Sequence, residues 1–178
     1  MTGPGGGRII SLEVRAVARV FLSLGSNLGD REANLRAALR LISKLPSTCI
    51  TRMSRVYQTA PWGVEEQPDF LDMAAEIDTD IGPRELLREL KQIERHLARV
   101  PGPQWSPRPI DIDILLFEGV QLQTPELSIP HPLISRRAFV LIPLLEIAPD
   151  EVLPDGSRIE DAARKAEGEV QVYGTVSL

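Results

Sequence analysis

Asp111 and Asp113 are two carboxylates separated by a single residue within an otherwise apolar stretch at positions 108–117. Its β-branched residues favour a strand, in which residues i and i+2 point to the same face. The two carboxylates would then project together, with their Cα atoms roughly 6.6–6.8 Å apart. The opposite face, directed toward a core, would carry Ile110, Ile112 and Ile114. Adjacent carboxylates repel unless a cation lies between them, and Mg²⁺ suits oxygen ligands and bridges phosphates.

The same alternation of polar and apolar residues is also typical of an ordinary half-exposed strand. The preceding residues favour a binding site, because Trp105 and Arg108 place an indole and a guanidinium close to the two carboxylates. These groups suit a charged, flat ligand such as a nucleotide. The residues alone leave both interpretations open.

Basic residues repeat along one face of a helix predicted to begin at residue 83. They are spaced by three and four positions, at Arg88, Lys91, Arg95 and Arg99. Such a stripe is usually a solvated face. The helix leads into the segment before the acidic strand, however, so Arg99 could reach the same ligand as Arg108.

Two further segments have more than one interpretation. His131 lies between Pro130 and Pro132 and beside Arg137, so its imidazole either contacts a phosphate or caps a turn. The turn at 25–30 precedes a helix N-terminus, where anions can bind, although a simple strand-to-helix turn explains it equally. The sequence contains no Gly-Lys-Ser/Thr phosphate loop.

Aromatic residues offer a less polar candidate surface. Phe70 and Phe139 are more often core residues than a stacking pair, whereas Trp62 lies in a Pro/Gly-rich segment and could line a cleft.

These residues must be positioned by strands and helices. Along the chain, segments whose apolar residues repeat every second position, as in a strand, alternate with segments whose apolar residues repeat every three or four positions, as in a helix. Strands are predicted at 17–24, 50–57, 70–79, 110–117, 120–122 and 170–176. Helices are predicted between Asp30 and Pro46, and at 83–97, 137–147 and 159–166, with Pro143 bending the third or confining it to a first turn. This order favours an α+β fold: a ferredoxin-like α/β sandwich with a mainly antiparallel sheet and helices on both faces. We expect residues 1–16 to be a flexible tail and 17–178 a single domain.

Composition excludes several classes of protein. The chain has 178 residues, a net charge of −5, one cysteine and two histidines. The acidic balance argues against a general nucleic-acid binder, and the cysteine and histidine counts exclude an internal disulfide, a Cys-rich zinc site and a His₃ zinc site. The longest apolar stretch, 138–145, is far shorter than a membrane span of about 20 residues. We therefore expect a cytoplasmic protein with no membrane partner.

Several motifs in a fixed order resemble one enzyme family. They are Leu24 to Gly29, Tyr57 to Pro61, Gln67 to Leu71, Trp105 with Pro107-Arg108, the Asp-Ile-Asp strand, Pro130 to Pro132 and Arg137 to Pro149. From about residue 20 to 156 the chain is similar to 6-hydroxymethyl-7,8-dihydropterin pyrophosphokinases of folate biosynthesis. The resemblance implies ATP-dependent transfer of pyrophosphate to the pterin hydroxymethyl group, giving the pterin diphosphate and AMP.

The resemblance also implies roles for individual residues. Catalysis would involve Arg99, Arg108, Asp111 and Asp113, and the two aspartates would hold two Mg²⁺ ions. ATP would be bound by Glu94, Arg99, Trp105, Arg108, Ile114, Ser128, His131 and Arg137. The pterin would be bound by Thr59, Ala60, Pro61, Trp62, Phe70, Asp72 and Phe139. Small molecules would then be the partners of the protein, and we expect a monomer, with a dimer left open.

The chain departs from the family pattern at three places. Asp72 stands where the family typically has an asparagine that contacts the pterin, so either that contact changes, Asp72 takes a proton, or the substrate differs. Segment 100–104 lacks basic residues common in a loop thought to close over ATP. Ala98 replaces a common glycine just before Arg99.

Two other classes of function compete with the enzyme. One is a ferredoxin-like binding or regulatory domain without catalysis, which loss of Arg99, Arg108 or either aspartate would have favoured. The other is an RNA-binding module of similar topology, against which the acidic balance argues.

Overall fold

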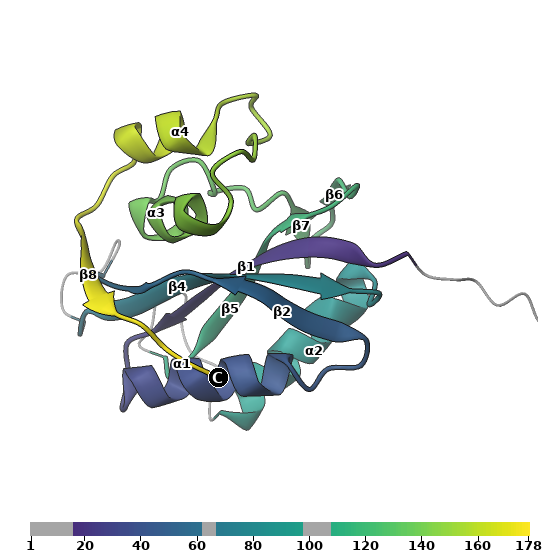
Figure 1. The fold of residues 1–178 in the computed structure, drawn as a ribbon, viewed down its shortest axis with the longest axis horizontal. Helices are drawn as coiled ribbons and strands as arrows, with labels where there is room; N and C mark the ends of the chain where they lie inside the picture. The colour runs from purple at the N-terminus through teal and green to yellow at the C-terminus, as the bar shows by residue number, and fades with distance from the viewer. Residues whose placement is uncertain (1–15, 62–66, 98–107) are drawn as a thin grey trace, which may run out of the picture.

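A six-stranded sheet lies between two layers of helices in the computed structural model, which describes residues 16–61, 67–97 and 108–178 (Figure 1). The elements in chain order are β1 Ala18–Ser26, α1 Arg31–Ile42, β2 Thr48–Met53, β3 Val56–Thr59, β4 Phe70–Thr79, α2 Pro83–His96, β5 Asp111–Phe117, β6 Leu122–Gln123, β7 Ser128–Ile129, α3 Ala138–Ile147, α4 Ile159–Lys165 and β8 Val170–Gly174. The expected ferredoxin-like α+β architecture is confirmed.

The strand order of the main sheet is β5-β1-β4-β3-β8, and β2 also pairs with β4. Each of these pairings is antiparallel. β5 lies at one edge of the sheet, where it pairs with β1 alone among the described strands. In the register, Gly25 of β1 is opposite Asp111 of β5 on one side and opposite Asp72 of β4 on the other.

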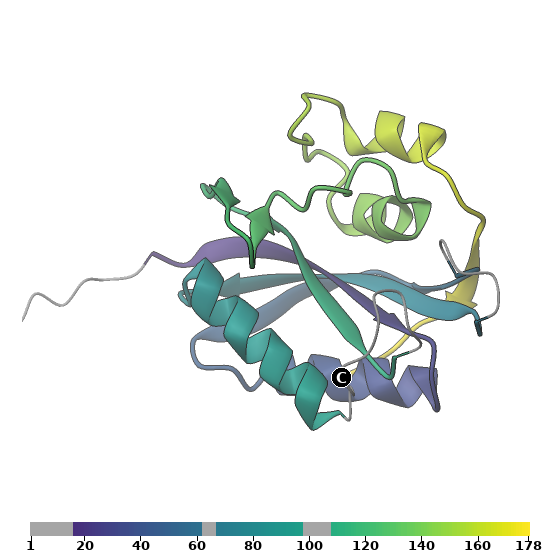
Figure 2. The ribbon, with the colours of Figure 1, turned by 180° about the vertical axis from the view of Figure 1, so that it is seen from behind.

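Helices α1 and α2 cover one face of the sheet (Figure 2). Asp30, where the first helix is predicted to begin, caps α1: its carboxylate accepts a hydrogen bond from the Ala33 N–H at 3.0 Å. Pro83 begins α2, where the missing N–H costs nothing. Apolar residues from both helices pack on the sheet in one core, which includes Leu24, Leu35, Leu39, Leu86, Leu90 and Ile112.

Helix α3 covers the other face, α4 packs on the outer side of α3, and the two helices form a second core with the sheet (Figure 1). That core includes Phe21, Leu115, Leu141, Leu144 and Ile159. The two cores on opposite faces explain why the central strands are buried on both sides, as β4 is almost throughout.

Three sequence predictions are corrected in detail. The strand expected at 50–57 is two strands, because the regular pairing with β4 is interrupted at Ser54. There the Ser54 side chain, in place of a carbonyl, accepts a hydrogen bond from the Ala74 N–H at 2.9 Å. The first helix ends at Ile42, ahead of Pro46. Pro143 does not confine the third helix to one turn: α3 continues from Ala138 to Ile147 around it, buried against the sheet.

The C-terminal part of the chain contributes to the sheet. β8 pairs with β3 through Val172 opposite Tyr57 and Val170 opposite Thr59. This pairing supports the prediction of one domain over 17–178, which stays a prediction, as does the flexible tail. Within the described ranges, no helix has both the length and the apolar character needed to cross a membrane.

Candidate active site

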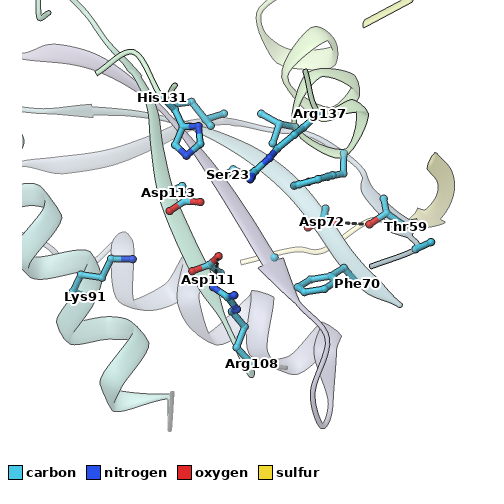
Figure 3. A pocket seen from close by; sticks show the side chains of 15 residues that line it. Ser23, Thr59, Phe70, Asp72, Lys91, Arg108, Asp111, Asp113, His131 and Arg137 are labelled. Atoms are coloured by element: carbon cyan, nitrogen blue, oxygen red, sulfur yellow. Dashed lines mark hydrogen bonds and ion pairs between the residues drawn. The ribbon is translucent and has the colours of Figure 1, made fainter. Parts of the chain in front are cut away.

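One pocket opens between the sheet, α2 and the N-terminal end of α3 (Figure 3). Its lining comes from every layer of the fold: Ser23, Gly25, Thr59, Ala60, Phe70, Asp72, Lys91, Arg108, Asp111, Asp113, Leu115, His131, Arg137, Phe139 and Val140. The part of the lining that contains Asp111 and Asp113 is called its charged end, and the part that contains Phe70, Asp72 and Phe139 is called its aromatic end.

The acidic strand has the alternation that its sequence predicted. Asp111 and Asp113 line the pocket, whereas Ile110 and Ile112 are fully buried in the core on the opposite face. Ile114 is 3% exposed and belongs to the same core, so its side chain does not line the pocket. The strand therefore presents two carboxylates to one cavity and uses its isoleucines to fix them there.

Electrostatics at the acidic end favour a bound cation. Burial and the nearby Asp111 carboxylate raise the pKa of Asp113 to about 6, and the Lys91 ammonium opposes that rise. Arg108 donates a 2.9 Å hydrogen bond to Asp111. Among the described residues no group of three or more His, Cys, Asp or Glu side chains could hold a metal. A pair of carboxylates alone suits Mg²⁺, which completes its coordination with water and substrate phosphates.

His131 resolves the two interpretations that its sequence left open. Its Nδ1 accepts a 3.2 Å hydrogen bond from the Leu133 N–H, so the ring does cap a turn. The same ring also lines the pocket, close to Asp113 in Figure 3. Burial and the Arg137 charge lower the His131 pKa to about 4, so the imidazole is neutral and carries its proton on Nε2. It can therefore donate a hydrogen bond to an anion in the pocket.

Arg137 connects the charged end of the pocket to the aromatic end. It is 7% exposed, and its guanidinium lies 5.5 Å from the centroid of the Phe139 ring. Burial lowers its pKa, while the Asp113 and Asp111 carboxylates act in the opposite direction. The arginine remains charged, because its ordinary pKa is far above neutrality.

The aromatic end of the pocket contains a buried carboxylate. Asp72 is 4% exposed and accepts a 2.6 Å hydrogen bond from the Thr59 hydroxyl. A side chain at Gly25 would place its Cβ only 2.7 Å from Asp72 Oδ1, so glycine is required at that position. Burial raises the Asp72 pKa to about 7, and the Asp111 charge adds to that rise.

Most predicted site residues that the structure describes line this pocket. Exceptions are Glu94, Ile114, Ser128 and Pro61, whose side chains lie elsewhere. Glu94 is 1% exposed and accepts a 2.8 Å hydrogen bond from the Ile112 N–H, so it supports the acidic strand from behind. The predictions for Trp62, Arg99, Trp105 and the departures at 98 and 100–104 lie outside the described residues.

Sequence reasoning missed five residues that line the pocket: Ser23, Gly25, Lys91, Leu115 and Val140. Signals existed for Lys91, which belongs to the basic stripe, for Gly25, which belongs to the predicted turn at 25–30, and for Leu115, which continues the alternation of Asp111 and Asp113. Ser23 lines the pocket because of its register with Asp113, which the local sequence does not reveal.

Asn27 joins three segments that surround the site. Its side-chain amide donates to Gln67 Oε1 at 3.1 Å and to the Pro68 carbonyl at 3.4 Å. Its side-chain oxygen accepts from the Arg108 N–H at 2.8 Å, and its own N–H donates to the Arg108 carbonyl at 3.2 Å. Asn27 is 1% exposed, so these bonds are shielded from water.

Paired carboxylates facing several cations, beside a flat apolar surface, are the features of an enzyme that transfers phosphoryl groups to a small aromatic molecule. Comparison with known proteins agrees. The sequence matches the family described as 7,8-dihydro-6-hydroxymethylpterin-pyrophosphokinase (HPPK) over residues 21–149. The chain belongs to this family, whose reaction is pyrophosphoryl transfer to hydroxymethyldihydropterin in folate biosynthesis, and the resemblance stated above is confirmed.

Individual relatives give the same result. The chain is 42% identical over 151 residues to a 2-amino-4-hydroxy-6-hydroxymethyldihydropteridine pyrophosphokinase of Methylorubrum extorquens, covering 85% of this chain and 95% of that protein. It is 46% identical over 127 residues to the enzyme of the same name from Bacillus subtilis, covering 71% and 76%.

Solved structures support the fold. A Plasmodium falciparum HPPK-DHPS triple mutant with SDX-DHP has a TM-score of 0.69 at 18% identity, over 89% of this chain. The chain spans 46% of that protein's length. At this identity the similarity concerns the fold alone.

Removing the Asn27 side chain should destabilise the protein. Asn27→Ala deletes bonds to two neighbouring segments and leaves the Arg108 N–H without its side-chain acceptor, at an expected cost of about 1–3 kcal/mol. Urea denaturation measures this loss. Asn34→Ala is the control, because within the described part of the chain the Asn34 side chain bonds to nearby residues of the preceding segment alone, Ser26 and Leu28. An equal loss in both variants would contradict the role of Asn27 as a link between segments.

Asp72 should make stability depend on pH. Because its pKa rises to about 7 in the folded state, the folded protein holds a proton that the unfolded chain releases. Stability therefore falls as the pH rises from about 4 to about 7, by up to about 4 kcal/mol. Asp72→Asn cannot ionise, so it should gain stability relative to the unaltered protein across this range.

Urea denaturation at pH 5 and pH 8 tests this expectation. Asp78→Asn, a partly exposed carboxylate further along the same strand, provides the matched control. If the free energy of unfolding changed between pH 5 and pH 8 by the same amount in Asp72→Asn and in the unaltered protein, ionisation of Asp72 would not destabilise the folded state.

Proposed function

We propose that this pocket is the active site of the pyrophosphokinase, with ATP at its charged end and the dihydropterin at its aromatic end. The observation that carries this assignment is the convergence of two carboxylates, several cations and two aromatic rings on one cavity. The bound pterin would lie between Phe70 and Phe139, with its hydroxymethyl group toward Asp111 and Asp113.

Charge balance supports two Mg²⁺ ions. The lining contains three carboxyl groups (Asp72, Asp111 and Asp113) and three cations (Lys91, Arg108 and Arg137), so its formal charge is zero with all three carboxyls ionised and +1 with Asp72 protonated. ATP brings about four negative charges, which two divalent ions would offset. Asp111 and Asp113 would hold these ions, which when bound would partly neutralise the negative charge of the phosphates.

The residues of the chain supply position and charge for the reaction. The hydroxymethyl oxygen forms a bond to the β-phosphorus as the bond from that phosphorus to the α–β bridging oxygen breaks. AMP leaves, and the proton of the hydroxyl group is released to solvent. Arg108 and Arg137 would stabilise the charge on the phosphate oxygens, and the neutral His131 would donate its Nε2 proton in a hydrogen bond. We assign Arg99 and Trp105 to the same subsite from the resemblance alone.

At the aromatic end, Asp72 acts best when it holds a proton. Protonated, it offers one donor and one acceptor, as the asparagine more usual at this position does. Thr59 donates to one of its oxygens. The raised pKa makes this form accessible near neutral pH. Ala60, Pro61 and Trp62 would contact the pterin edge, and Ser128, Ile114 and Glu94 would contribute to ATP binding by main-chain or indirect contacts.

The rival of a binding domain without catalysis is disfavoured, because Arg108, Asp111 and Asp113 all lie at one pocket. A monomer and a cytoplasmic location remain predictions.

Loss of either strand carboxylate should abolish turnover. We expect Asp111→Asn and Asp113→Asn to lower AMP release from ATP, Mg²⁺ and 6-hydroxymethyl-7,8-dihydropterin by at least about 100-fold, because each removes a metal ligand. Asp78→Asn is the control for loss of one charge elsewhere on the sheet. Near-normal turnover in either strand variant, with a preserved circular dichroism spectrum, would refute the metal assignment.

The protonation of Asp72 should appear in substrate binding. At saturating ATP, the KM for the pterin should rise as the pH increases through about 7, and in Asp72→Asn it should stay constant. The KM for ATP over the same range is the internal control. A pterin KM that instead falls above pH 7 would identify the ionised carboxylate as the binding form.

A further inference from the structure

We propose that Lys91 binds the polyphosphate of the nucleotide from the α2 side of the pocket, and that Glu94 is the positioning residue that holds Lys91 there. This inference rests on the proposed function and adds a phosphate-binding residue outside the predicted set.

The basic stripe of α2 is not uniform. Arg88 is exposed and pairs with Glu85 on its own helix at 3.2 Å, as expected of a solvated face. Lys91 lies one turn further on and lines the pocket. In Figure 3 its ammonium points from α2 toward Asp111 and Asp113. One member of the stripe thus faces the site, and its neighbour one turn earlier does not.

A buried carboxylate fixes the position of this ammonium. Glu94, whose side chain is 1% exposed, accepts from Lys91 Nζ at 2.8 Å and from the Ile112 N–H at 2.8 Å, both through Oε1. Ile112 lies between the two aspartates on the edge strand, on the side that has no described strand partner. The same carboxylate therefore positions both the cation and the strand that carries Asp111 and Asp113.

Lys91 retains capacity for a ligand. An ammonium has three N–H donors, and the bond to Glu94 uses one of them. The ammonium lines the same pocket as Asp111 and Asp113. In Figure 3 Arg137 lies on the other side of the two carboxylates from Lys91. A polyphosphate placed along Asp111 and Asp113 would therefore have a cation on each side.

This role predicts an effect that grows with the number of phosphates. In Lys91→Gln, affinity for ATP should fall about 10-fold to 100-fold, the loss expected for one charge-assisted hydrogen bond. Affinity for AMP and the KM for the pterin should change less than about twofold, and Lys91→Arg should restore most ATP binding. Equilibrium titration with ATP and with AMP gives these affinities independently of turnover.

Matched variants separate binding from structure. Arg88→Gln removes a charge from the same helix face outside the pocket and should leave ATP affinity unchanged. Because Lys91→Gln leaves Glu94 buried without its lysine, Lys91→Gln/Glu94→Gln removes both charges and keeps a neutral acceptor for the Ile112 N–H. This double variant should show the same ATP-selective loss.

Two outcomes would overturn the inference. One is unchanged ATP affinity in the double variant. The other is an equal loss for ATP and AMP, because a purely structural ion pair would affect both alike. A failure of the proposed function is distinguishable, since it would appear as absence of AMP release by the unaltered protein.

Discussion

The register of three neighbouring strands is the constraint on which the site depends. It places Asp111, Gly25 and Asp72 in one row across β5, β1 and β4. Side chains in such a row point to one face, and adjacent strands are about 4.8 Å apart, so the two carboxylates would be about 10 Å from each other. Glycine between them leaves the space that a Cβ would fill, 2.7 Å from Asp72. The row that runs from Asp111 through Gly25 to Asp72 thus connects the charged end of the pocket to its aromatic end.

Holding carboxylates on one face requires compensation from the helices that cover the sheet. Behind the acidic strand, Glu94 of α2 satisfies an edge-strand N–H and is itself compensated by Lys91. In front of it, Arg137 precedes α3 and reaches back over Phe139. Each helix layer therefore contributes one cation to the acidic end, and the sheet contributes the acids. This division explains why the site lies where both layers approach the edge of the sheet.

Local sequence patterns predicted the parts of this arrangement that depend on one element. Alternation around Asp111 and Asp113 gave the strand, its pocket face and its core face, and the Asp30 cap gave the start of α1. The break near Ser54 was not predictable, because it depends on an N–H from a different strand. The bond that Glu94 accepts from the Ile112 N–H was not predictable for a similar reason: the two residues are 18 positions apart, and only the packing of α2 on β5 brings them together.

Net charge illustrates the same limit. The overall charge of −5 describes the whole chain and says nothing about a pocket whose lining has as many cations as carboxylates. For a polyphosphate, the important feature is that cations lie on both sides of the two carboxylates. The cations can then attract the phosphates while the carboxylates hold the metal ions. Burial strengthens these interactions, as the shifted pKa values of Asp113 and His131 show. A neutral histidine and a carboxylate that gains a proton near pH 6 are consequences of one shared, water-poor environment. A bound cation would favour the ionised form of the Asp113 carboxyl group. The acidic end is therefore better suited to the metal–nucleotide complex than to the pocket without a ligand.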